Sequence, residues 1–238
     1  MSFTTDALLY PLTKGDVKGH NFHGNQYETV GGEGKTNTPR PPAGQFQFTT
    51  GEIKKLAELT DGNKDGIIDR VAVGTAKVLG MDNPAQRVSQ SPNGRPPQFY
   101  RGCDDDGAYS LLEPLQHYNI GKGGMASGAG VYATRDINVA NEYSDGVVVK
   151  MWLDPTAKVC TDDDTVELSK QCAQQFKDAF DRGDITESQF KILRIEAHSP
   201  SFSAMAFGYQ AVDTPDYQGG QLVVLDRSIL KVQFKPTY

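Results

Sequence analysis

Apolar residues first recur with the spacing of a helix after residue 49. Ile53, Leu56 and Ala57 fall on one side of a helix that starts near Thr50, and residues 71–79 continue the pattern in a second helix that ends at Gly80. Residues 12–48 lack apolar periodicity and are rich in Gly, Pro, Asn, Gln and Thr. The pattern therefore predicts a flexible leader over residues 1–48 and a helix-loop-helix over residues 49–90.

Residues 91–238 mix short apolar runs with longer helical stretches. Helices are predicted at residues 109–118 and 166–180, and a strongly apolar strand at residues 147–153. Short strands and helices separated by Gly or Pro turns indicate one α+β domain. We expect the strand at 147–153 to have partners at 193–197, 211–212, 222–225 and 230–234.

The loop between the first two helices is acidic and reads DGNKDGIID over residues 61–69. It resembles an EF-hand calcium loop, with Gly66 at the sharp bend. The last position of that pattern holds Ala72 instead of a bidentate Glu, which removes two oxygens and one negative charge. A weak Ca²⁺ site and a metal-free loop that caps the helix are both open interpretations. On the first, the ligands are Asp61, Asn63, Asp65, the carbonyl of Ile67, and Asp69.

Charge and composition narrow the class of protein. The 238 residues carry a formal net charge of −6 without a basic stripe, which argues against nucleic-acid binding. The longest apolar runs have the length of strands, so we expect no membrane span. Residues 1–11 lack the basic start and long apolar region of a signal peptide, so we expect none. The three cysteines are expected to be free thiols, with a Cys160–Cys172 disulfide as the alternative in an oxidising compartment.

The most informative stretch is residues 129–143, which Gly128 precedes. Gly128 and Gly130 allow a close approach of the backbone, and residues 131–134 then form a short strand. Asp136 is a good N-cap for the helix that follows. Tyr132 and Tyr143 lie at the two ends of this unit, where their rings could flank a slot for a flat heteroaromatic ring.

Two further segments extend the motif: residues 99–102 read Phe-Tyr-Arg-Gly, and residues 221–226 read Gln-Leu-Val-Val-Leu-Asp. Together with the unit above, their order resembles the ADP-ribosyltransferase superfamily over about residues 95–238. The resemblance implies two packed antiparallel sheets split by a cleft for NAD. The residues that match the pattern are Arg101, Gly102, Gly130, Tyr132, Thr134, Ala140, Tyr143 and Gln221.

The resemblance implies a role for each of these residues. The backbone of Gly102 would bind the nicotinamide amide, Tyr132 and Tyr143 would hold the ring between them, and Gly130 would be a further NAD-binding residue. Arg101 would reach the ribose or the pyrophosphate, because a guanidinium is a planar fork of donors with permanent charge. Thr134 would orient Arg101 or Gln221. An ordinary strand residue is the alternative interpretation of Thr134.

Gln221 stands where the superfamily usually carries its catalytic Glu. A glutamine accepts a hydrogen bond from a ribose hydroxyl but has no charge to oppose a cationic transition state, a loss on the order of 100- to 1000-fold in rate. Either the enzyme is slow, or the protein binds NAD without turnover, or another carboxylate enters the site. Candidates for that carboxylate are Asp213, Asp216 and Glu142.

The leading hypothesis is a mono-ADP-ribosyltransferase that modifies a macromolecular acceptor, a protein of a bacterial host. The alternative is a catalytically degenerate NAD-binding or structural phage protein, and a nucleic-acid or small-molecule acceptor is a third hypothesis. Residues 18–27, KGHNFHGNQY, resemble a short element near domain junctions of tailed-phage proteins. We therefore expect the protein in the cytoplasm of the host or target cell, carried by the virion before delivery.

Overall fold

The computed structural model describes residues 40–61, 67–94, 96–116, 128–215 and 220–235, with the backbone alone for residues 68 and 69. It is an α+β protein, as the sequence predicts. The helices are α1 (Thr50–Glu58), α2 (Ile67–Leu79), α3 (Asp105–Ser110), α4 (Ile137–Glu142), α5 (Asp162–Asp181), α6 (Glu187–Ala197) and α7 (Pro200–Ala206). The strands are β1 (Gln86–Arg87), β2 (Gln98–Cys103), β3 (Val131–Thr134), β4 (Val147–Leu153), β5 (Val159–Thr161), β6 (Ala211–Thr214), β7 (Gln221–Val224) and β8 (Leu230–Gln233).

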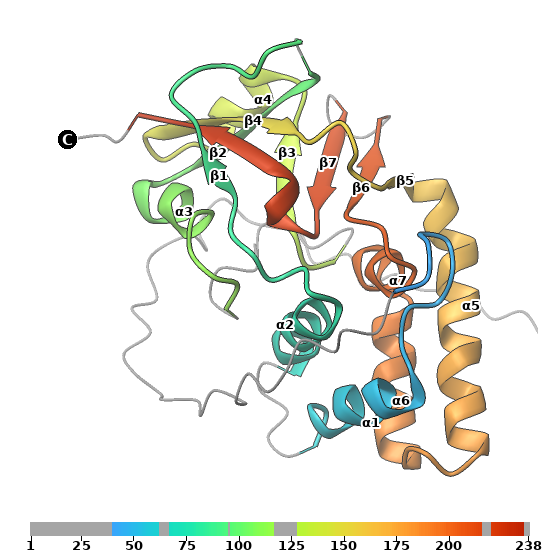
Figure 1. Ribbon diagram of the computed structural model, residues 1–238. Coiled ribbons are helices and arrows are strands. Elements are labelled where there is room, and N and C mark those ends of the chain that lie inside the picture. The colour runs from blue at the N-terminus through green and yellow to red at the C-terminus, as the bar shows by residue number, and fades with distance from the viewer. Residues whose placement is uncertain (1–39, 62–66, 95, 117–127, 216–219, 236–238) are drawn as a thin grey trace, which may run out of the picture. The chain divides into compact units, whose positions relative to one another are not determined.

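The eight strands of the described residues form one sheet in the order β1-β8-β4-β2-β3-β7-β6-β5. β1 runs parallel to β8 and β5 runs parallel to β6, whereas all other neighbours are antiparallel. β2 and β4 pair from Gln98 to Cys103, but β2 and β3 pair only at Tyr100 and Thr134. The sheet therefore has two halves joined at one residue pair, and Figure 1 shows the halves running in different directions.

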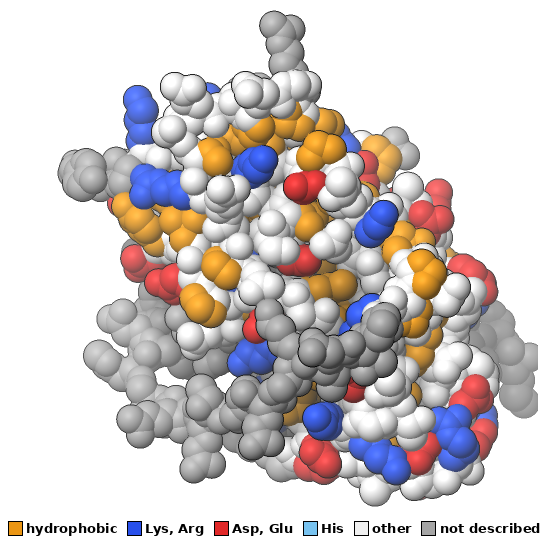
Figure 2. Space-filling view, viewed as in Figure 1, with side chains coloured by type: hydrophobic (Ala, Val, Ile, Leu, Met, Phe, Trp, Pro, Cys, Tyr) orange, Lys and Arg blue, Asp and Glu red, His pale blue; other side chains and the backbone are white. Residues whose placement is uncertain are grey.

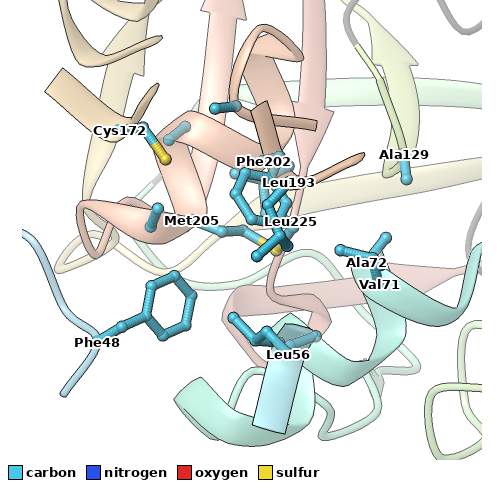
Figure 3. Packing of buried hydrophobic residues seen from close by; sticks show 14 of the residues in the cluster. Phe48, Leu56, Val71, Ala72, Ala129, Cys172, Leu193, Phe202, Met205 and Leu225 are labelled. Atoms are coloured by element: carbon cyan, nitrogen blue, oxygen red, sulfur yellow. The ribbon is translucent and has the colours of Figure 1, made fainter. Parts of the chain in front are cut away.

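Side chains on the two faces of the sheet enter separate apolar clusters. Phe99 and Val149 from one half share a cluster with Val131 and Leu222 from the other half, so both halves turn the same face toward it. Val223, which points to the opposite face from its neighbour Leu222, belongs to the cluster that the helices cover. Phe202, Leu193 and Leu225 meet there from α7, α6 and the residue after β7 (Figure 3).

Side-chain caps set the starts of the main helices. Thr49, Thr161 and Thr186 each form a capping box at the start of α1, α5 and α6. Asp104 caps α3, and Asp136 caps α4 as the sequence predicts. The aspartates at 162–164 lie in the first turn of α5, where negative charge interacts favourably with the helix dipole.

The structure corrects several expectations. Residues 193–197 are the end of α6, not a strand. The helix predicted at 109–118 is wrong for residues 111–116, because α3 ends at Ser110, and residues 117 and 118 lie outside the described residues. The resemblance implies two separate antiparallel sheets, but the described strands form one mixed sheet with a narrow junction. Tyr100 and Thr134 pair at the place where the gap between the sheets is expected. All three cysteines are free, so the alternative of a Cys160–Cys172 disulfide is wrong.

Residues 40–48, at the end of the predicted leader, pack onto the helical layer. Phe48 is 7% exposed, and Phe46 makes edge-on ring contacts with Phe176 and Phe207. Arg40 donates to both carboxylate oxygens of Glu52. Burial of these aromatic rings orders the segment, although its composition is mostly polar. Residues 1–39 lie outside the described residues.

Charged side chains of both signs are intermixed where α5 turns into α6 (Figure 2). The pairs here include Lys177 with Asp181 and Arg182 with Asp184. None of the helices in the described part of the chain combines the length and the apolar character needed to cross a lipid bilayer.

Candidate functional site

The candidate site begins where β2 and β3 separate. If the pairing of Tyr100 with Thr134 continued, Gly102 would face Tyr132 in the next part of the ladder. Instead the guanidinium of Arg101 lies between the two strands, and its Nη1 donates to the main-chain carbonyl of Tyr132 at 3.1 Å. A side chain thus takes the place of a ladder hydrogen bond at the junction of the two halves.

The guanidinium of Arg101 is poorly solvated. Burial lowers the pKa of Arg101, and the nearby Cys103 and Asp104 partly oppose this shift. Burial also raises the pKa of the Cys103 thiol, an effect that the positive charge of Arg101 reduces. The Nε of Arg101 is buried without a hydrogen-bond partner among the described residues. A permanent charge with one unused donor therefore lies at the split.

Gly102 lies directly against the end of α4. A Cβ at this position would stand 1.9 Å from the carbonyl oxygen of Ala140 and 2.6 Å from the main-chain nitrogen of Ser144. The main-chain N–H of Asp145 donates to the carbonyl of Cys103 and holds the same contact. The space beside the Cα of Gly102 is therefore filled by protein, so packing of α4 gives a sufficient reason for glycine here.

Packing against the neighbouring strand also explains the glycine at position 130. A Cβ at residue 130 would stand 2.6 Å from Cγ1 of Val223 and 3.0 Å from the carbonyl oxygen of Val224 on the neighbouring strand β7. The close approach that the sequence assigns to a ligand is made here by β7.

The two tyrosines occupy different environments. Tyr143 is the C-cap of α4 and is 64% exposed, next to Gly102. Tyr132 is half-buried against the helical layer, and its hydroxyl donates to the carbonyl of Gly128. The side chain of Tyr143 is therefore largely exposed, whereas the ring of Tyr132 packs on the core.

Gln221 lies in a row of residues that crosses the second half of the sheet. It pairs with Thr134 on β3 and with Thr214 on β6. The hydroxyl of Thr214 donates to the Gln221 carbonyl at 3.0 Å, and the buried Thr134 hydroxyl accepts from the N–H of Asp136. The side-chain oxygen Oε1 of Gln221 is buried without a partner among the described residues. It is an acceptor with unused capacity.

The substitute carboxylates do not share this row. Asp213 pairs with Leu222 and so points to the opposite face of the sheet from Gln221, where its Oδ2 lies 2.7 Å from Nη2 of Arg135. Glu142 is exposed at the end of α4. Asp216 lies outside the described residues.

The acidic loop is only partly described. Oδ2 of Asp61 accepts from Nε2 of Gln189 at 2.9 Å, and Ile67 is the buried first residue of α2. Asn63, Asp65 and the side chain of Asp69 lie outside the described residues. Within the described residues no three His, Cys, Asp or Glu side chains gather as a metal site. Calcium binding stays a prediction.

A hollow of about 280 Å³ lies at the opposite end of β3 from Thr134. Arg101, Gly102 and Tyr143 do not line it. Sequence reasoning missed this hollow because its walls come from distant segments with no shared motif. Its lining includes Gly128, Ala129, Glu196, His198, Ser201 and Met205.

Comparisons with known proteins add little. No protein-family model and no curated protein matches the sequence. A solved structure titled "Crystal structure of an anti-CRISPR protein" aligns with 60% of this chain and 100% of its own, at 14% identity and a TM-score of 0.32. This likeness is too slight to bear on the fold or the activity.

Proposed function

We propose that the protein is a mono-ADP-ribosyltransferase that uses NAD and modifies a protein acceptor of a bacterial host. The observation that carries the proposal is the split after Tyr100 and Thr134, with the Arg101 guanidinium crossing it to the Tyr132 carbonyl. Beside this split, main-chain atoms of Tyr132 and Tyr143 contact Arg101 and Gly102, respectively. These are the residues that the resemblance assigns to NAD.

Two polar groups beside the pair of Tyr100 and Thr134 are left for a ligand, one on each face of the sheet, because Arg101 follows Phe99 by two residues and Gln221 precedes Leu222 by one. The Nε of Arg101 is a buried donor and the Oε1 of Gln221 is a buried acceptor, and each lacks a partner among the described residues. A buried polar group left unpaired costs about 1–3 kcal/mol, which a ligand recovers by pairing with it. Tyr143 is 64% exposed, and the resemblance assigns its ring to stacking on the nicotinamide.

On this proposal each residue has a limited task. Bound NAD supplies the ADP-ribosyl group and a nicotinamide leaving group. Arg101 holds the ribose or pyrophosphate by charge, Tyr143 stacks on the planar ring, and Gln221 accepts a hydrogen bond from a ribose hydroxyl. Gln221 orients the sugar but contributes no negative charge, so turnover is slow.

Binding of NAD without turnover is the second candidate, and the position of Asp213 favours it. That carboxylate points away from the Gln221 face and is engaged by Arg135, so it leaves the row of Thr134, Gln221 and Thr214 without a negative charge. A cationic transition state would then lack its usual partner.

The test is release of nicotinamide and transfer of label from radiolabelled NAD in a bacterial lysate. Wild-type protein should release nicotinamide, and Arg101→Ala and Tyr143→Ala should lose this activity. Lys177→Ala, on the exposed face of α5, is the control for a removed cation and should match the wild type. Equal release by the wild type and both site variants contradicts the proposal. NAD binding without release selects the second candidate.

A further inference from the structure

Arg135 continues the register of β3 by one residue. Its main-chain N–H donates to the carbonyl of Gly220 at 3.1 Å, immediately after the pairing of Thr134 with Gln221. Gly220 is the residue before Gln221, so Arg135 contacts the backbone that leads into the candidate site. Gly220 has a positive φ of 78°, a conformation that glycine adopts readily.

The guanidinium of Arg135 touches three segments at once. Its Nη2 lies 2.7 Å from Oδ2 of Asp213 on β6, and its Cζ lies 5.0 Å from the ring centroid of Phe99 on β2. A Cβ at Gly220 would stand 2.9 Å from Nη1. One planar cation thus connects both halves of the sheet and packs against the Cα of Gly220.

From these contacts we infer that Arg135 and Asp213 are positioning residues for Gln221. Both side chains lie on the face of the sheet that carries Phe99 and Leu222, opposite to Gln221. They act through the backbone at Gly220, because their side chains do not lie on the face that carries the Gln221 side chain. The effect on turnover rests on the proposed function, whereas the effect on the Gln221 side chain does not.

The chemistry of the pair explains why a guanidinium is needed. Lysine would keep the charge opposite Asp213, but an ammonium cannot also lie flat against Phe99 and fill the space beside Gly220. Arg135→Lys should therefore keep the fold while loosening the backbone at Gly220. Asp213→Asn removes the negative charge at nearly constant shape and should weaken the hold of residue 213 on the Arg135 guanidinium.

The experiment follows the side-chain amide of Gln221 by two-dimensional ¹H–¹⁵N NMR of the full chain. The resonance pair is assigned by its disappearance in Gln221→Glu. Arg135→Lys and Asp213→Asn should shift or broaden it while the melting temperature stays close to that of the wild type. Arg182→Lys, in the pair of the exposed Arg182 with Asp184, is the matched control and should leave it unchanged.

The kinetic part uses NAD cleavage by the same variants. We expect kcat to fall about 10-fold in Arg135→Lys with KM within about twofold, because misplacement of a group near the reacting bond affects turnover more than binding. The double swap Arg135→Asp with Asp213→Arg restores the ion pair but not the contact at Gly220, so kcat should stay low. Full recovery of kcat in the swap overturns the inference.

The two proposals can fail separately. An unchanged Gln221 amide resonance in both Arg135→Lys and Asp213→Asn overturns the positioning role, whatever NAD does. If the wild type neither binds nor cleaves NAD, the proposed function fails, and a shifted resonance still supports the positioning of Gln221. A raised KM with unchanged kcat in Arg135→Lys overturns the role in turnover.

Discussion

The Cα of Gly102 lies so close to the carbonyl oxygen of Ala140 that a Cβ would stand 1.9 Å from it. Main-chain atoms cannot yield as a flexible side chain would, so Gly102→Ala should displace α4 and Tyr143 with it. Overpacking of this kind costs about 1–3 kcal/mol. Thermal unfolding should show a lower melting temperature, together with loss of NAD binding if the proposed site is correct.

Gly51 in α1 is the control for this substitution, because a Cβ there meets nothing within 4 Å. Gly51→Ala should raise stability by roughly 0.5–1 kcal/mol, since alanine favours helix and restricts the unfolded chain. A melting temperature for Gly102→Ala equal to that of the wild type would show that α4 moves freely.

Replacing Gln221 with Glu should increase NAD cleavage. The substitution places a carboxylate beside the row of Thr134 and Thr214, where it opposes the positive charge that develops on the ribose. The expected gain is on the order of 100- to 1000-fold in kcat. Nicotinamide release measures it, and Gln171→Glu on the exposed side of α5 controls for the added charge. An unchanged kcat in Gln221→Glu would show that residue 221 does not contact the reacting ribose.

Stability should depend on pH through Glu52. Burial by itself raises the pKa of Glu52, but hydrogen bonds from Arg40 and Thr49 and the charge of Arg40 outweigh it, so the pKa is lowered. A carboxylate with a lowered folded-state pKa stabilises the fold fully above its ordinary pKa, and this stabilisation is lost as the pH falls through the lowered value.

Glu52→Gln should therefore destabilise the protein by about 2 kcal/mol near neutral pH, and by much less in acid below the folded-state pKa. Urea unfolding at both pH values measures the difference. Glu187→Gln removes a fully exposed pair with Lys191 and should have almost no effect at either pH. The same loss for Glu52→Gln at both pH values would contradict the assigned cause.

Thiol reactivity should distinguish the three free cysteines. Burial raises the pKa of Cys160 to about 12 and also raises that of Cys172, so neither forms thiolate at neutral pH. Cys103 is only half-buried. A thiol reagent should titrate at most Cys103 in the folded protein and all three after denaturation. Fast reaction of two or three thiols in the native state would argue against this packing.

Local signals explain which elements could be predicted. α1 starts at a capping box of Thr49 and Glu52, and α4 starts at Asp136, both within a few residues of the apolar pattern that they serve. The sequence predicts a strand at residues 193–197, where Leu193, Ile195 and Ala197 alternate with polar residues. In the structure Ile195 is 66% exposed, whereas Leu193 and Ala197 are buried four residues apart on one helical face.

The candidate site also has parts that local sequence signals predict and parts that they do not. The sequence by itself determined the strand and capped helix between Tyr132 and Tyr143, because caps and turns depend on contacts within a few residues. Only the tertiary structure decided that Arg101 bonds to the Tyr132 carbonyl and that Asp213 faces away from Gln221. These relations depend on strand register across long stretches of chain, and a shift of one residue would reverse the face of every side chain in the strand.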